Sequence, residues 1–213
     1  MPRIAELRAP ALPTTPVQQE RCDRALEAAA RLCAEHGMEH VQMQQVAAEA
    51  GIALGTLYRY YPSKHHLFAG VLSRNVAALG RRSSPTSSDP AEAVADLMGS
   101  ACRTMLRHPL LARAMISAVN AVRSGPSAEH DTTMRDRILQ VAGITEPTAS
   151  DLRLARLVEQ CTYGVLTWAA AGEMAAEEAV EDVRRACRLL LEPWRTVSGA
   201  REARRPRPAR RSG

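Results

Sequence analysis

A glycine-centred turn between two short amphipathic segments constrains the fold of this 213-residue chain more than any other feature. Residues 43–50 carry apolar side chains at helical spacing, and Gly51 stops that segment. Residues 54–61 then make barely two helical turns before Pro62, because proline lacks a backbone donor and disfavours helix at the preceding residue. Two short helices joined by a three-residue turn containing glycine are typical of a helix-turn-helix unit.

The remaining sequence predicts an all-α protein. Only 3% of the residues are aromatic, and alanine, leucine, valine and methionine are abundant, which favours helices over strands. Apolar spacing and helix stop signals predict further helices at 18–36, 63–79, 90–107, 109–123, 131–142, 149–171 and 176–194. We therefore expect one helical unit at 17–80, which contains the helix-turn-helix, and a second helical unit at 88–196, between a flexible arm (1–16) and a basic tail (197–213).

The net charge of the chain and its lack of membrane or export signals bear on which partners it binds and where in the cell it is found. The net charge of +5 lies entirely in residues 197–213, so that overall basicity is weak evidence for a DNA-binding fold. These arginines predict either an unspecific attraction to DNA or a solvated end with no function. The chain has no apolar run long enough to span a membrane and no signal peptide, which predicts a cytoplasmic protein without membrane contacts.

The segment from Thr56 to Phe68 contains four of the seven aromatic residues of the chain. We expect Tyr61 and Phe68 to anchor two short helices in the core, and Tyr58 and Tyr60 to face the DNA backbone. Hydroxyl groups of threonine and tyrosine donate well to phosphate oxygens, and arginine reaches a phosphate or a guanine edge.

The start of the next helix adds a possible phosphate site. Ser63 is expected to cap this helix, and Lys64, the only lysine of the chain, stands in its first turn. An ammonium group beside free backbone N–H groups suits a phosphate.

The run VQMQQVAAEAGIALGTLYRYYPSKHHL resembles the TetR family of bacterial transcriptional regulators, over about residues 18–72. The resemblance implies a three-helix DNA-binding head, a body that binds a small molecule, and a homodimer formed by the last two helices. Together with the side-chain chemistry of Arg59, it places DNA contacts at Gln42, Met43, Gln44, Ala53, Leu54, Gly55, Thr56, Tyr58, Arg59, Tyr60 and Lys64.

The sequence departs from the family pattern at the edges of this run. Gln42 and Ala53 stand where the family commonly has hydroxyl side chains, which removes two expected phosphate contacts. His65 and His66 stand where the family often has two glutamates, which removes negative charge close to DNA. We therefore predict that operator affinity rises as the pH falls through about 6.5, the reference pKa of histidine.

The body is rich in flexible methionines, which suit an adaptable apolar cavity, although plain core packing would use the same residues. The segment HPLLARAM, together with VQM, is similar to TetR-type repressors of sterol and lipid catabolism in actinobacteria, which suggests an acyl-CoA or steroid effector. The candidate effector-binding residues are Met98, Met105, Met115, Ile116, Val119, Tyr163 and Trp168.

Two helical stripes combine small and apolar residues, as a four-helix interface between two subunits requires. The predicted dimer residues are Val158, Cys161 and Val165 in the first stripe and Val183, Cys187 and Leu190 in the second. A dimer would place two recognition helices about 34 Å apart, one helical turn of DNA.

We expect a ligand-responsive repressor that binds a palindromic operator as a homodimer and is released by a small hydrophobic effector. The alternatives are an activator or dual regulator of the same fold, and a helical scaffold that binds no DNA. We expect no enzyme, metal or cofactor, because His36 and His40 have the spacing of a zinc pair but Gly37 breaks the helix between them. The five cysteines form no disulfide framework or zinc ribbon, and are expected to be small buried side chains.

Overall fold

The computed structural model describes residues 10–79, 87–124 and 131–195, and within these ranges it contains nine α-helices and no strand. The expected all-α class is therefore confirmed. The helices are α1 (Pro16–His36), α2 (Met43–Glu49), α3 (Leu54–Tyr60), α4 (Lys64–Leu79), α5 (Pro90–Leu106), α6 (Pro109–Arg123), α7 (Thr133–Val141), α8 (Ala149–Ala171) and α9 (Ala176–Leu190). The tail at 197–213 and most of the linker between head and body lie outside the described residues.

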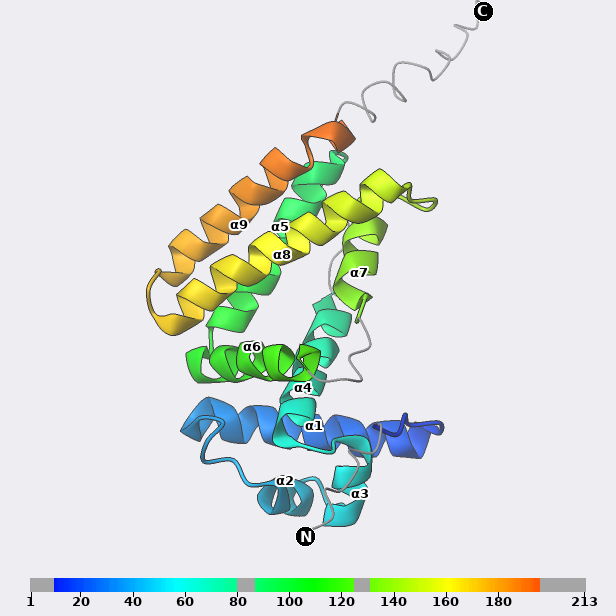
Figure 1. Ribbon diagram of the computed structural model, residues 1–213, viewed down its shortest axis with the longest axis vertical. Helices are drawn as coiled ribbons and strands as arrows, with labels where there is room; N and C mark the ends of the chain where they lie inside the picture. Colours follow the sequence, from blue (N-terminus) through cyan, green and yellow to red (C-terminus); the bar gives the residue numbers. More distant parts are fainter. Residues whose placement is uncertain (1–9, 80–86, 125–130, 196–213) are drawn as a thin grey trace, which may run out of the picture.

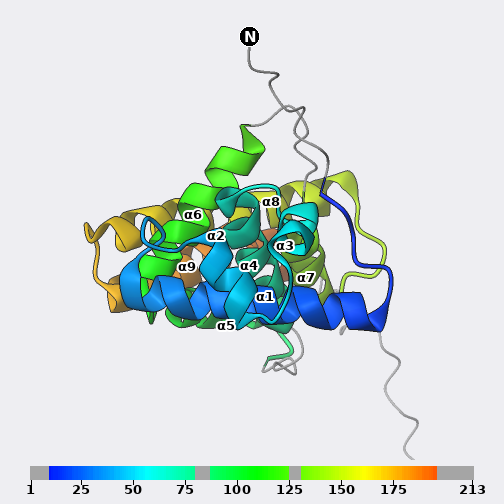
Figure 2. The ribbon, with the colours of Figure 1, turned by 90° about the horizontal axis from the view of Figure 1, so that it is seen from below.

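The molecule is elongated, with the helix-turn-helix unit at one end. In Figure 1, α2 and α3 lie beyond α1 at the lower end, and α8 and α9 lie at the upper end. Seen from below, α2 and α3 lie side by side against α1 (Figure 2). α4 and α6 occupy the middle and pack against each other, so that they connect the two ends.

Two hydrophobic cores divide the molecule, and one of them is shared between head and body. The head core contains buried residues of α1 to α4, including Leu57, Leu67 and Phe68, and also four residues of α6. The body core is built from α5 to α9. The residues that α6 contributes to the head core are Leu111, Ala114, Met115 and Ala118.

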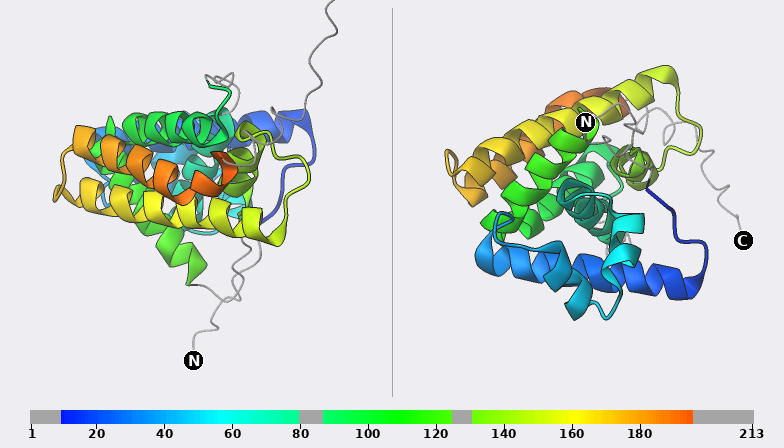
Figure 3. Two further views of the ribbon diagram at one scale, coloured as in Figure 1. Left: turned by 90° about the horizontal axis from the view of Figure 1, so that it is seen from above. Right: turned by 60° about the horizontal axis from the view of Figure 1, so that its bottom comes forward.

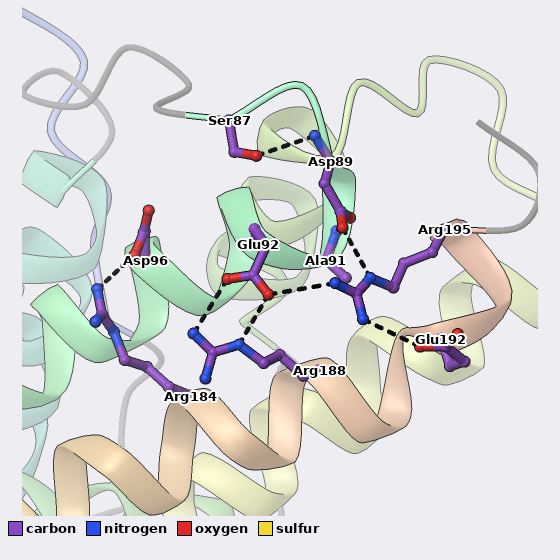
Figure 4. A network of polar contacts seen from close by, with 9 residues as sticks. All are labelled: Ser87, Asp89, Ala91, Glu92, Asp96, Arg184, Arg188, Glu192 and Arg195. Carbon is purple, nitrogen blue, oxygen red and sulfur yellow. Dashed lines mark hydrogen bonds and ion pairs between the residues drawn. The ribbon is translucent and has the colours of Figure 1, made fainter. Parts of the chain in front are cut away.

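α9 is held between α5 and α8, as the left view of Figure 3 shows. Besides apolar contacts, a ladder of ion pairs joins α9 to α5 (Figure 4). Arg188 binds Glu92 with both Nε and Nη2, at 2.8 and 3.1 Å, and Arg195 Nε donates to Asp89 Oδ2 at 2.7 Å. Arg184 pairs with Asp96 one turn away. Such partly exposed pairs are each worth about 0–1 kcal/mol, so the ladder fixes the register of the two helices more than it adds stability.

Residues 10–15, which the sequence assigned to a flexible arm, contact the head, whereas residues 1–9 of that arm lie outside the described residues. The backbone N–H of Ala11 donates to the carbonyl of Arg59 at 3.0 Å, which fixes the segment before α1 against the end of α3. Thr15 then caps α1, because its hydroxyl accepts from the N–H of Gln18. Residues 10–15 are thus part of the head rather than a free arm.

The cysteines, the metal-ligating side chains and the apolar helices of the described residues bear on the remaining sequence predictions. Four of the five cysteines are buried and Cys161 is half-buried, and all five are free thiols. No group of three or more metal-ligating side chains comes together within the described ranges. No helix among them has the length and apolar character needed to cross a membrane.

Candidate functional site

The turn between α2 and α3 is fixed by backbone hydrogen bonds at the end of α2. The N–H of Ile52 donates to the carbonyl of Ala47 at 3.0 Å, and that of Gly51 to the carbonyl of Ala48 at 3.1 Å. This pair of bonds is a Schellman motif, which requires a left-handed residue, and Gly51 supplies it with φ of +64°. The sequence therefore sets the angle between α2 and α3 locally, as predicted from the glycine.

Two cationic side chains hold this unit by binding backbone carbonyls. Arg24 of α1 donates from Nε to the carbonyl of Ala50, at the end of α2, at 3.0 Å. Lys64 donates from Nζ to the carbonyls of Met38 and Glu39, at 3.0 and 3.3 Å. These two bonds give Lys64 a role that the sequence did not predict, and its predicted phosphate contact stays a prediction. Its ammonium lies against the loop between α1 and α2, where it positions α2.

Most of the predicted DNA-contacting residues lie on one exposed surface, which we call the tip. The side chains or backbone of Gln42, Gln44, Ala53, Gly55, Tyr58 and Arg59 are exposed, and Leu54 and Thr56 are half-buried. The chain contains no aspartate or glutamate between Glu49 and Asp89, so the tip brings no carboxylate of α3 or α4 towards a phosphate backbone. Short polar groups, a tyrosine hydroxyl and an arginine that forms no ion pair within the described residues are suited to contacting a DNA duplex.

Two of the predicted DNA contacts are buried instead. Met43 begins α2 and turns its side chain into the head core, and Tyr60 retains only 7% exposure. The sequence placed Tyr61, four residues after Leu57, on the buried face of a longer helix. α3 ends at Tyr60, however, and Tyr61 has the non-helical φ and ψ of −128° and 87°. Leu57 and Tyr60, three residues apart, therefore share the buried face of α3. Tyr61 packs against the head core from outside the helix.

The start of α4 confirms the predicted cap and changes the role of one histidine. The N–H of His66 donates to the hydroxyl of Ser63 at 3.3 Å, and the imidazole Nδ1 of His66 lies 2.8 Å from the same hydroxyl. Burial, helped by the neighbouring His65, lowers the pKa of His66 below its ordinary value. The side chain of His66 is thus a capping partner of Ser63, and the predicted pH dependence of operator affinity stays a prediction.

A cavity of about 160 Å³ lies between α4, α5, α6, α7 and α8. Its wall is mostly apolar, and four of the seven predicted effector residues line it: Met98, Met105, Val119 and Tyr163. The apolar wall also includes Leu72 and Val76 of α4, which the sequence did not single out.

Three predicted effector residues lie elsewhere. Met115 is buried in the head core, because α6 turns this face to the head. Ile116 belongs to the body core, where its carbonyl accepts from the hydroxyl of Tyr163 at 3.0 Å. Trp168 is 59% exposed on the outer face of α8. All three are apolar residues at helical spacing, and the spacing alone does not tell which face of a helix meets a cavity.

Polar side chains also line the cavity, and they lie close to one another. Arg123 of α6 pairs with Glu159 of α8 at 3.5 Å, and the Ser73 hydroxyl of α4 donates to Asp131 at 2.6 Å. Burial raises the pKa of the Glu159 carboxyl above its ordinary value, although Arg123 acts in the opposite direction. Thr162 also lines the cavity. The effector-binding residues predicted from the sequence were selected for their apolar or aromatic side chains, and these polar residues of the cavity wall were therefore missed.

The predicted dimer residues divide into buried and half-buried ones. Val158, Val183 and Cys187 lie in the body core of the same chain, so they are not available to a second subunit. Cys161, Val165 and Leu190 are half-buried. The large apolar residues that α8 and α9 do expose are Leu152, Leu157, Trp168 and Leu189. We call the surface of Leu157, Trp168 and Leu189 the outer face.

A helix-turn-helix tip joined through α4 to a helical body with an internal cavity defines a ligand-responsive DNA-binding regulator. The comparisons agree with this class. Residues 25–71 match the model described as "Bacterial regulatory proteins, tetR family", and residues 88–190 match "Tetracyclin repressor-like, C-terminal domain". The chain belongs to the TetR family.

Individual relatives support the same assignment. The chain is 38% identical over 145 residues to the HTH-type transcriptional repressor KstR of Rhodococcus jostii, which covers 66% of this chain and 68% of the relative. A TetR transcriptional regulator from Rhodococcus sp. RHA1 has a similar crystal structure, with a TM-score of 0.73 and 42% identity over 82% of this chain and 96% of that one. The structure of Thermus thermophilus FadR in complex with lauroyl-CoA, at 19% identity, shares the fold over 90% of this chain and 99% of its own, with a TM-score of 0.62. The predicted resemblance to actinobacterial repressors of this family is thus confirmed.

Proposed function

We propose that two copies of this chain associate through the outer face, read a two-fold symmetric operator with their tips, and leave it when a hydrophobic effector enters the cavity. The observation that carries this proposal is the course of α4. Its first turns hold the head, through Lys64, Leu67 and Phe68, and its later residues Leu72 and Val76 line the cavity. A change at the cavity therefore reaches the tip through one continuous helix.

The size of the cavity supports a coupling between binding and movement. About 160 Å³ is close to the volume that holds a single benzene-sized ring. A steroid or a long acyl chain needs more room, so the lining side chains and α4 must move to admit it. An effector releases DNA only if it binds the displaced arrangement more tightly than the DNA-bound one.

The class of effector is the less constrained part of the proposal. The apolar lining and the three cavity methionines, Met98, Met105 and Met134, favour an adaptable site for a hydrophobic molecule. The lauroyl-CoA bound to the FadR neighbour makes an acyl-CoA one candidate. The sequence resemblance of HPLLARAM and VQM to repressors of sterol and lipid catabolism makes a steroid-like molecule the other.

The first experiment selects genomic fragments with the purified protein and titrates the enriched site at two salt concentrations. A palindromic site bound at nanomolar affinity is the expected result. Lauroyl-CoA and progesterone are then added to the complex, and at least one should release the DNA.

Val119→Phe, which fills the cavity, is the matched control: it should keep operator binding and lose the release. Binding without sequence preference that vanishes when residues 197–213 are removed would contradict the proposal.

A further inference from the structure

Thr162 is the one polar residue that is buried among the described residues, at 6% exposure. It lies in the middle of α8, four residues from Val158 and from Leu166, where apolar side chains form the buried face. Its side chain lines the cavity together with Leu166 and Tyr163. A hydroxyl group at this position is unfavourable for core packing alone, because a buried polar group requires a hydrogen-bond partner.

Within the described residues, the Thr162 hydroxyl makes no hydrogen bond to protein. A threonine inside a helix commonly satisfies its hydroxyl by donating to the carbonyl four residues before it. Thr167, on the exposed side of the same helix, does this with the carbonyl of Tyr163 at 2.8 Å. Thr162 has the same option at the carbonyl of Val158 and does not use it. Its donor and acceptor sites are therefore free to face the contents of the cavity.

The charged side chains that line the cavity limit which chemical groups of a ligand bind favourably beside them. Two carboxylates, Glu159 and Asp131, lie beside Arg123, and both nearby guanidiniums already have carboxylate partners: Arg123 pairs with Glu159, and Arg135, which also acts on Glu159, pairs with Asp136. A ligand carboxylate beside Glu159 and Asp131 would add a third negative charge. A neutral carbonyl or hydroxyl carries no such penalty and still forms a hydrogen bond.

We infer that Thr162 is a specificity-determining residue: its hydroxyl binds a neutral oxygen atom, a carbonyl or a hydroxyl, of an otherwise apolar effector, and the site discriminates against free acids. This inference rests on the proposed function, because it assigns a role within the same effector cavity. It narrows the effector class from hydrophobic molecules in general to oxygenated neutral ones.

The test measures binding of small probes to the full-length protein by calorimetry, without DNA. Acetophenone, ethylbenzene and benzoate share one aromatic ring of the size that the cavity holds, and differ in carrying a neutral carbonyl, no oxygen and a carboxylate. The informative quantity is the ratio of the ethylbenzene Kd to the acetophenone Kd, because general differences in hydrophobicity cancel when this ratio is compared between variants.

Thr162→Val replaces the hydroxyl by a methyl group of nearly the same shape. We expect it to lower the Kd ratio about tenfold, as the loss of one buried hydrogen bond implies, by weakening acetophenone and leaving ethylbenzene unchanged or tighter. Thr162→Ser restores the hydroxyl and should keep most of the ratio. Thr167→Val, which removes the back-bonded hydroxyl of the same helix, should leave the ratio unchanged. Benzoate should bind the parent protein at least tenfold more weakly than acetophenone.

An unchanged ratio in Thr162→Val overturns the inference, and so does benzoate binding as tightly as acetophenone or the absence of saturable binding by any probe. Failure of the proposed function has a different signature. If the ratio falls as expected but no hydrophobic molecule releases the operator, Thr162 reads the ligand and the regulatory proposal fails. If the operator is released and the ratio does not change, only the role of Thr162 is refuted.

Discussion

The tip and the outer face are both exposed, yet they differ in nearly every property that determines a partner. The tip presents Gln44, Gly55, Tyr58 and Arg59, with no carboxylate from α3 or α4. The outer face presents Trp168 at 59% and Leu189 at 70% exposure. Polar groups on short helices are suited to a phosphate backbone, whereas exposed tryptophan and leucine side chains are typical of protein interfaces. The comparison teaches that the local composition of an exposed surface separates two kinds of contact that the net charge of the chain does not distinguish.

The largest predicted effect concerns the outer face. Truncating Trp168 to alanine should raise the dimer Kd about 30-fold or more, because a buried interface tryptophan is commonly worth about 2 kcal/mol or more. Sedimentation equilibrium measures this Kd, and operator affinity should fall with it. Leu110→Ala removes a 42% exposed leucine of α6 that lies beside Met38 and Lys64 of the head, and serves as the control. A dimer as stable as the parent in Trp168→Ala would place the subunit interface elsewhere.

Two glycines, Gly55 at the tip and Gly70 inside the head, differ in the space around them, and alanine substitutions at both test this difference. A Cβ atom at Gly70 would meet Cε1 of Tyr61 at 2.9 Å and Cδ2 of Leu26 at 3.1 Å, so Gly70→Ala should destabilise the protein by about 1–3 kcal/mol. A Cβ atom at Gly55 meets nothing within 4 Å, so Gly55→Ala should raise stability by about 0.5 kcal/mol. The added methyl group should nevertheless weaken operator binding, because it lies between the backbone of α3 and the duplex.

Urea unfolding and operator titration of both variants test this pair. Gly70→Ala with the stability of the parent would mean that Tyr61 moves freely, and tighter operator binding by Gly55→Ala would mean that α3 meets DNA with another side.

Tyr58 and Tyr60 provide a finer test of which residues the tip presents. Tyr58→Phe should weaken operator binding about fivefold, the value of one hydrogen bond of about 1 kcal/mol, since Tyr58 is 45% exposed. Tyr60→Phe should leave it unchanged, because that side chain is buried. A band-shift titration of both variants on the same operator is sufficient. Equal losses in the two would show that the head rearranges on DNA.

The smallest predicted effect is a pH dependence of protein stability, which arises at His66 in the first turn of α4, next to the tip. Because the pKa of His66 is lower in the folded protein than in the unfolded chain, its contribution to stability is fully present above about pH 6.5 and declines as the pH falls below that value. Urea unfolding between pH 5 and 8 should show a flatter curve for His66→Gln than for the parent. His40→Gln, at an exposed histidine, is the control and should keep the pH dependence of the parent. A parent-like dependence of stability on pH in His66→Gln would assign this dependence to other groups.

The predicted rise of operator affinity at low pH is tested separately with the His65→Gln, His66→Gln double variant, in which the rise should disappear.

The sequence was sufficient for features that depend on local chemistry. Gly51 predicted the turn between α2 and α3, Ser63 predicted the cap of α4, and Pro62 predicted the end of α3 to within a residue. Features that depend on which side of a helix meets which neighbour were harder to predict. Val158 and Trp168 are both apolar residues of α8, and only the packing of α5 and α9 shows that the first is internal and the second external.

Lys64 illustrates a different limit of sequence reasoning. Its position at the start of α4 was correct, but its carbonyl partners at Met38 and Glu39 belong to a loop 25 and 26 residues away in the chain. Thr162, in contrast, could have been predicted as a cavity residue from the sequence. It is a hydroxyl residue inside a helical apolar stripe, four residues from Val158 and from Leu166. A polar residue in a buried stripe indicates either an internal partner or a ligand.

The sharing of the head core with α6 has a consequence for how the protein folds and melts. Without Leu111, Ala114, Met115 and Ala118, a fragment ending before α5 would leave apolar surface of the head uncovered, and we expect it to aggregate rather than to act as a transplantable DNA-binding module. Head and body should therefore unfold in one cooperative transition. A ligand that binds only the folded body would then raise the melting temperature of the head as well, so that a thermal scan could report on effector binding through any probe placed in the DNA-binding end.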